Sequence, residues 1–142
     1  MNIEVFFSSA EIEKLEIGMS ASYAQTITEA DISIFAGVSG DKNPAHVNEE
    51  YAQASRFKRR IAHGMISASF FSGILGTRLP GAGCVYTSQT LNFKRPVYIG
   101  ETVTATVTVQ EIDLKTRRVK LFTVCKVKNK TVIDGEAEVY IP

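Results

Sequence analysis

The sequence predicts an α+β domain in which a curved antiparallel sheet packs around one long apolar helix. Residues 64–76 are apolar or small on every side of a helix, which is typical of a helix surrounded by protein. From about residue 83 onward, polar and apolar residues alternate and β-branched side chains are frequent, as in strands with one buried face. Because no linker or repeat divides the 142 residues, the chain is expected to form a single domain, 1–142.

The first half of the chain is expected to hold one strand and three helices. Residues 20–27 are predicted to form a short strand. Thr28 suits the N-cap of the helix that follows, since acidic residues occupy its first turn and Gly40 suits its end. Asn43-Pro44 predicts a tight bend, because proline disfavours helix in the residue before it. Residues 48–54 then form a short helix, and the long apolar helix comes after a basic segment.

The second half is expected to supply most of the sheet. Its predicted strands cover residues 85–93, 101–112, 119–128 and 132–141. The turns between the last three lie at residues 113–116 and at Asn129-Lys130, the second being a candidate for a tight hairpin. A curved antiparallel sheet wrapped around a long apolar central helix is the architecture called the hot-dog fold.

Composition limits the classes of function. The formal net charge of +1 gives no electrostatic reason to expect a nucleic-acid or membrane partner. The most apolar run, residues 61–76, is shorter than the roughly 20 residues that span a bilayer. The N-terminus lacks the pattern of a signal peptide, so a cytoplasmic location is expected. Cys84 and Cys125 are expected to be reduced core thiols, and no metal site is expected from two cysteines and two histidines without ligand-like spacing.

The segment from Asp41 to His46 carries the strongest chemical signal in the chain. It places a carboxylate and an imidazole five residues apart, on either side of the Asn43-Pro44 bend, so that both can face one space. A carboxylate and a neutral imidazole that share one water molecule can act as a general acid–base pair. Taken singly, Asp41 could serve only the turn and His46 could be an exposed loop residue.

The pattern Asp41-x-Asn43-Pro44-x-His46, followed by His63-Gly64-Met65 at the head of the apolar helix, resembles the (R)-specific enoyl-CoA hydratases. These are single-domain hydratases of the MaoC-like hydratase and dehydratase family in the hot-dog superfamily, and some supply monomers for polyhydroxyalkanoate synthesis. The resemblance covers nearly the whole chain, including residues 70–76, 91–97 and 135–137. It implies reversible hydration of a trans-2-enoyl-CoA to an (R)-3-hydroxyacyl-CoA, within fatty-acid metabolism, with no cofactor.

Carried over to this chain, the resemblance assigns the catalytic water to Asp41 and His46, with Asn43 in support. The backbone N–H of Gly64 would bind the thioester carbonyl, and Ser72 and Leu75 would line the acyl pocket. Because the family is typically homodimeric, the resemblance implies a homodimer or a higher homo-oligomer.

Further residues belong to the same hypothesis. The bulky Phe71, together with Leu75, favours short acyl chains. His63 would support the site, although it could simply hydrogen-bond the backbone near the helix start. In the basic run, Arg59 and Arg60 would steer the phosphates of CoA, unless that run is only a solvated surface.

Other functions remain open at this point. Hot-dog folds also host acyl-thioester hydrolases, which would share the pocket and the helix-end donor. A non-catalytic acyl-CoA-binding module is a third reading, which the intact Asp41–His46 pair opposes. Dehydration of a substrate attached to acyl-carrier protein is a variant of the first. A serine hydrolase is disfavoured because the sequence has no Gly-x-Ser-x-Gly elbow.

Overall fold

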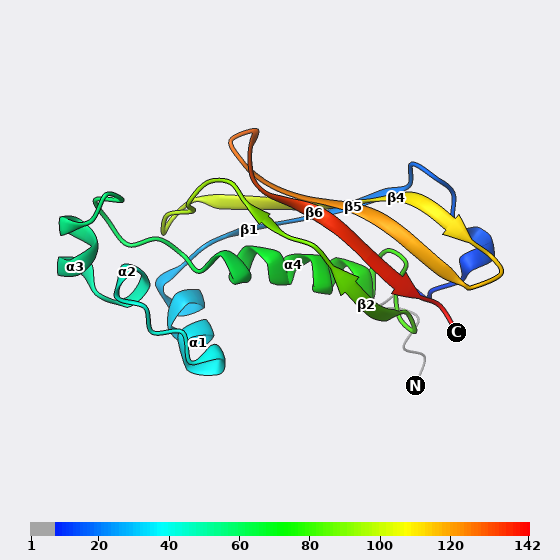
Figure 1. The fold of residues 1–142 in the computed structure, drawn as a ribbon, viewed down its shortest axis with the longest axis horizontal. Coiled ribbons are helices and arrows are strands. Elements are labelled where there is room, and N and C mark those ends of the chain that lie inside the picture. Colours follow the sequence, from blue (N-terminus) through cyan, green and yellow to red (C-terminus); the bar gives the residue numbers. More distant parts are fainter. Residues whose placement is uncertain (1–7) are drawn as a thin grey trace.

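The computed structural model describes residues 8–142 and has the predicted α+β architecture. One sheet, entirely antiparallel, lies along the long helix α4 (Gly64–Thr77), and three short helices extend beyond one end of the sheet (Figure 1). The strand order is β1-β4-β5-β6-β2, with the short β3 also pairing with β6. This arrangement is the hot-dog fold.

The strands follow the predicted segments closely. The sheet consists of β1 (Ser20–Thr26), β2 (Val85–Gln89), β3 (Asn92–Phe93), β4 (Thr102–Asp113), β5 (Arg118–Val127) and β6 (Lys130–Tyr140). The predicted strand 85–93 is broken into β2 and β3 at residues 90–91, which are not in a strand, and the register also shifts within β2 between Tyr86 and Ser88. The predicted tight hairpin is present one residue earlier, with Lys128 and Asn129 at positive φ.

The helices of the first half begin and end where their caps predict. In α1 (Glu29–Ser39), Thr28 and Asp31 form a reciprocal capping box, and Gly40 ends the helix in the left-handed conformation. Asn48 caps α3 (Glu49–Ala54). The bend expected at Asn43-Pro44 is instead the start of a one-turn helix, α2 (Pro44–Val47), because proline is favourable at a first helical position, where no N–H is needed.

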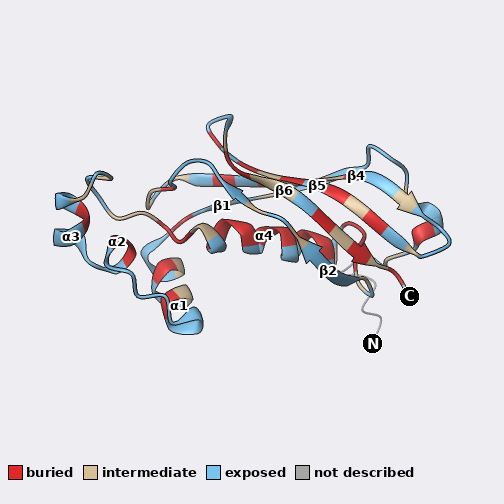
Figure 2. Ribbon diagram, in the orientation of Figure 1, coloured by how far each residue is buried: buried red, intermediate tan, exposed pale blue. Residues whose placement is uncertain are grey.

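The hydrophobic core lies between α4 and the sheet (Figure 2). Buried side chains alternate along β4 and β5, and α4 contributes Ile66, Phe70, Phe71, Ile74 and Leu75 to the same cluster. The opposite face of α4 is open in the single chain, where Met65, Ser69 and Ser72 are exposed. The expectation that protein surrounds this helix on every side therefore holds only for the face toward the sheet.

Two further expectations concern thiols and membranes. Cys125 is buried and Cys84 is half-buried, and both are free thiols as expected. Burial raises the pKa of Cys125 to about 12. Among residues 8–142, no helix has both the length and the apolar character that a membrane crossing requires.

Candidate active site

The segment from Asp41 to His46 is shaped by a succession of short side-chain hydrogen bonds. The Asp41 carboxylate accepts the N–H of Asn43 at 3.1 Å, and the Asn43 side-chain oxygen accepts the N–H of Ala45 at 3.0 Å. Asn43 thereby caps α2 and orients the turn, which supports the helper role expected of it. As a result, His46 lies inside α2 with 9% of its surface exposed, whereas Asp41 stays exposed in the preceding loop.

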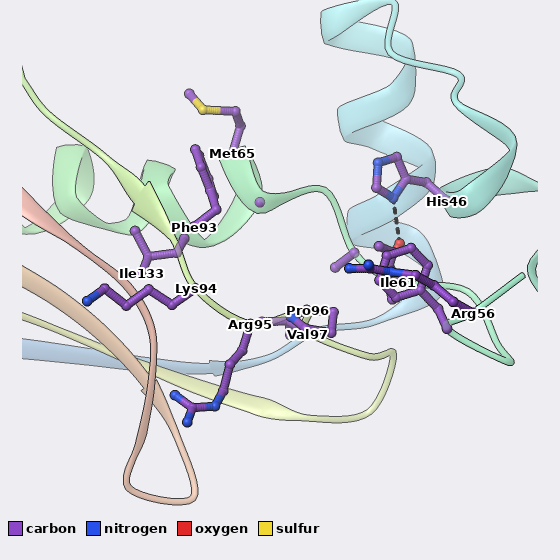
Figure 3. Close-up of a pocket in the computed structure, with 13 residues that line it drawn as sticks. His46, Arg56, Ile61, Met65, Phe93, Lys94, Arg95, Pro96, Val97 and Ile133 are labelled. Atoms are coloured by element: carbon purple, nitrogen blue, oxygen red, sulfur yellow. Dashed lines mark hydrogen bonds between the residues drawn. The ribbon is translucent and has the colours of Figure 1, made fainter.

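The ring of His46 has a defined protonation pattern. Its Nδ1 lies 2.7 Å from the carbonyl oxygen of Ile61 (Figure 3). Because a carbonyl oxygen only accepts, Nδ1 must carry a proton, and in the neutral ring Nε2 then presents the lone pair. Neutral His46 can therefore accept a proton at Nε2 without any change of tautomer.

Asp41, His46 and His63 come together in space. One ligand atom from each lies within 4.8 Å of the others. Two groups that share one water molecule lie roughly 4.5 Å apart when each hydrogen bond is about 2.8 Å long. The spacing of the Asp41 carboxylate and the His46 imidazole is thus suited to a single shared water.

The same three residues make a poor metal site. The rings of His46 and His63 are stacked, with centroids 4.0 Å apart and planes at 31°. The lone pair of an imidazole nitrogen lies in the ring plane, so stacked rings direct their lone pairs side by side instead of toward one point, as metal coordination requires. The packing of the two rings therefore favours a shared water over a cation at this point.

Gly64 opens α4 directly after His63. The N–H groups in the first turn of a helix have no partner within that helix, and they carry the positive end of the helix dipole. The segment leading to Gly64 is fixed by the N–H of Ala62, which donates to the carbonyl of Val97 at 2.7 Å. A Cβ at Gly64 would lie 2.5 Å from a ring carbon of Phe93, so only glycine fits beneath this ring.

A cavity of about 400 Å³ joins these elements (Figure 3). His46 and Gly64 line it, with Phe57, Met65 and Phe93 as apolar walls. Its size is within the range of small-molecule sites. Met65 and Phe93 are about half exposed, at 50% and 54%, so that a ligand entering the cavity would cover apolar surface that is now open to solvent.

The basic residues of the cavity differ from those expected. Arg56, Lys94 and Arg95 line it. Arg60 instead pairs with Glu29 and with Glu49, the latter at 3.0 Å, and Arg59 lies over the ring of Tyr98 at 4.2 Å.

Neither Arg59 nor Arg60 is part of the cavity wall, so the structure does not support the expected placement of these two arginines. Lys94 and Arg95, which line the cavity, were not expected from the sequence. The available signal was that they form a basic pair directly after β3.

The three residues expected in the acyl pocket are divided between two environments. Ser72 lines a second cavity of about 480 Å³, together with Phe35 and Tyr86. Met65 lines both cavities and therefore separates them. Phe71 and Leu75 are fully buried in the core beneath α4, and neither lines the cavity beside His46. Their expected effect on chain length stays a prediction.

Comparison with known proteins agrees with this arrangement. Residues 13–132 match the model of the MaoC like domain family. The chain is 58% identical to an (R)-specific enoyl-CoA hydratase from Rhodospirillum rubrum, over 92% of this chain and 90% of that protein. It is 45% identical to a 3-hydroxybutyryl-CoA dehydratase from Methylorubrum extorquens, over 92% and 83% respectively. The solved (R)-hydratase from A. caviae involved in PHA biosynthesis superposes with a TM-score of 0.89 at 38% identity, covering 92% of this chain and 99% of that one.

Proposed function

Because the chain belongs to the family of MaoC-like domains, we propose that it is an (R)-specific enoyl-CoA hydratase. It adds water reversibly across the double bond of a trans-2-enoyl-CoA and yields the (R)-3-hydroxyacyl-CoA. The observation that carries this proposal is the proximity of the Asp41 carboxylate to the His46 imidazole, close enough to share one water, with His46 and Gly64 lining the same cavity.

The acid–base pair performs both proton transfers of the reaction. The water held between Asp41 and His46 attacks C3 of the substrate while the pair accepts its proton, and a proton is delivered to C2. Both transfers occur from the same side of the double bond, because Asp41 and His46 lie close together and share one water, and addition is therefore syn. The water, the pair and a backbone donor suffice for this chemistry, which needs no cofactor.

The head of α4 stabilises the negative charge that develops on the thioester oxygen. The Gly64 N–H points from the first turn of the helix, where the dipole also favours an anion. A donor of this kind contributes about 3 kcal/mol to lowering the barrier when it is aimed at the developing charge. The Phe93 ring packs against Gly64 at this point of the cavity.

The two ends of the substrate occupy different surroundings. Arg56, Lys94 and Arg95 place positive charge at the cavity that would receive the CoA phosphates. The acyl chain passes Met65 toward the second cavity and Ser72. Phe71 and Leu75 are buried on the opposite side of α4, toward the sheet, and their bulk is proposed to favour short chains.

The protein is further proposed to act as a homodimer. Strand β2 lies at the edge of the sheet with unpaired backbone groups on one side, and such edges in soluble proteins are usually covered. Beside it, α4 exposes Met65 and small residues that permit close approach of a second helix. Light scattering coupled to gel filtration tests this proposal, and a monomer at micromolar concentration would contradict it.

The decisive experiment is hydration of crotonyl-CoA, followed by loss of the enoyl-thioester absorbance and by chiral analysis of the product. Wild-type protein is expected to form the (R)-alcohol, and Asp41→Asn and His46→Gln are each expected to abolish turnover. Glu50→Gln, which removes an exposed carboxylate from α3, is the matched control and should retain full activity.

Other outcomes of this experiment assign other functions. Release of free thiol would identify a thioester hydrolase. Turnover only of a substrate on acyl-carrier protein would identify the corresponding dehydratase, and binding without turnover would identify an acyl-CoA-binding module.

A further inference from the structure

His63 contacts every part of the proposed catalytic arrangement, although it does not line the cavity. Building on the proposed hydration reaction, we propose that His63 is a positioning residue that holds Asp41, His46 and the Gly64 N–H in one arrangement. It acts through these groups and does not touch the substrate. Two contacts of the imidazole ring, the peptide bond that joins His63 to Gly64, and the chemistry of the second ring nitrogen support this role.

The first contact fixes the loop that carries Asp41. His63 Nε2 lies 2.8 Å from the backbone carbonyl oxygen of Asp41 and must donate to it, since the carbonyl only accepts. This hydrogen bond spans 22 positions of the chain and joins the exposed loop to the head of α4. It complements the Asx turn with Asn43, which orients the Asp41 carboxylate locally but does not tie the loop to the rest of the domain.

The second contact fixes the plane of the His46 ring. The two imidazoles stack with centroids 4.0 Å apart, while the edge of His46 is held by the Ile61 carbonyl. A ring held at one edge and across one face cannot rotate its Nε2 away from the water site. His63 also packs against Phe35, with ring centroids 4.8 Å apart and planes at 57°. His63 therefore contacts two aromatic rings, those of Phe35 and His46.

The third contact is covalent. His63 is the N-cap residue of α4, so its carbonyl group and the N–H of Gly64 belong to the same rigid peptide unit. Fixing the His63 ring fixes that peptide, and with it the direction of the proposed oxyanion donor. The acid–base pair and the donor thus share one support, which keeps the distance between them constant.

The remaining nitrogen of His63 argues against a role in packing alone. The side chain is 2% exposed, and Nδ1 contacts no solvent and has no hydrogen-bond partner among residues 8–142. A buried polar atom without a partner destabilises the fold, and phenylalanine would fill a similar volume without that cost. The imidazole gains only the hydrogen bond to Asp41, which is the contact that positions the catalytic loop.

Two variants separate the donor from the ring. His63→Phe keeps an aromatic face for His46 and removes the donor to Asp41, whereas His63→Gln keeps an amide donor and removes the stacking. Each is expected to lower kcat on crotonyl-CoA on the order of 10- to 100-fold, the range for small misplacement of catalytic groups, with KM changed less than about twofold. Ser67→Ala is the matched control, because Ser67 also has a buried, unpartnered polar atom one turn further along α4, and it should leave kcat unchanged.

Wild-type kcat in both folded His63 variants would overturn the proposal, whereas absence of hydration by the wild type would overturn the proposed function instead. A second measurement does not depend on the variants. The chain has only two histidines, so ¹⁵N NMR of histidine-labelled wild-type protein resolves both rings. The proposal requires protonated Nε2 in His63 and protonated Nδ1 in His46. The opposite tautomer at His63 would refute the hydrogen bond to Asp41 even if the variants failed to fold.

Discussion

The substitution Gly64→Ala tests the proposed oxyanion site at the one point where a side chain can obstruct a backbone donor. The added Cβ would lie 2.5 Å and 2.6 Å from two ring carbons of Phe93. Favourable carbon contacts are about 3.5–4.0 Å, so the ring and the helix head must separate by roughly 1 Å. Phe93 is 54% exposed, and its ring can turn outward without disturbing the core.

The consequences for activity and for stability should differ. The displaced ring and the new methyl group keep the thioester carbonyl from reaching the Gly64 N–H, which is expected to lower kcat by about 10²-fold, equivalent to about 3 kcal/mol of barrier. Alanine favours helix over glycine by at most about 1 kcal/mol, so Tm should change by no more than roughly 4 °C. Activity therefore falls while the fold remains.

The assay is steady-state hydration of crotonyl-CoA beside thermal unfolding of the same preparations. The double variant Gly64→Ala, Phe93→Ala removes the clash and should recover part of the loss, with Phe93→Ala alone as the reference. A folded Gly64→Ala protein with wild-type kcat would refute the reasoning, because it would place the thioester carbonyl elsewhere.

Three further predictions follow from buried and charged side chains. Leu75→Ala should lower the free energy of unfolding by about 2–5 kcal/mol, because Leu75 is 1% exposed in the core. The same variant should shift activity toward longer acyl chains. An unchanged chain-length profile would show that the acyl pocket lies elsewhere. Arg56→Glu should raise KM and weaken the dependence of KM on salt, because Arg56 lines the cavity. Arg60→Glu should mainly lower Tm, because it removes two ion pairs. Equal effects of the two variants on KM would contradict this distinction. Burial raises the pKa of Cys125 from 9.0 to about 12, so the neutral buried thiol contributes stability below pH 9.0 that is lost as the pH rises toward 12. Under native conditions at pH 8, iodoacetamide should label Cys84 faster than Cys125, because Cys84 is only half-buried. Mass spectrometry of the peptides measures the two labelling rates, and equal rates would contradict the difference in burial.

The sequence is sufficient for elements that local chemistry determines. The capping box at Thr28 and the left-handed Gly40 fix both ends of α1, and the alternation along β4 and β5 fixes their buried face. Pro44 was an ambiguous signal. Proline disfavours helix in the residue before it, but it is favourable as the first residue of a helix. At the break between β2 and β3, the carbonyl of Thr90 lies so close to Gly135 that a Cβ would not fit there.

The candidate site could be predicted only in part for a similar reason. Asp41 and His46 are close in sequence, so a motif of six residues brings them together. The cavity wall, in contrast, depends on the pairing of Ile61 with Tyr98, two segments that are distant in the chain. Among the basic residues, Arg60 cannot be distinguished from Arg56 by composition, because only the folded chain brings the carboxylates of Glu29 and Glu49 to Arg60.

The ion pairs of Arg60 determine how the catalytic segment can move. Its guanidinium joins α1, through Glu29, to α3, through Glu49, and donates to the carbonyl of His46 between them. Residues 36–61 contribute no side chain to the main hydrophobic cluster. Both carboxylates are about half exposed, so salt screens these pairs while leaving the hydrophobic attachment of the sheet intact. We therefore expect higher ionic strength to speed amide exchange around His46 more than in the sheet, because the ion pairs of Arg60 are among the contacts that hold this segment.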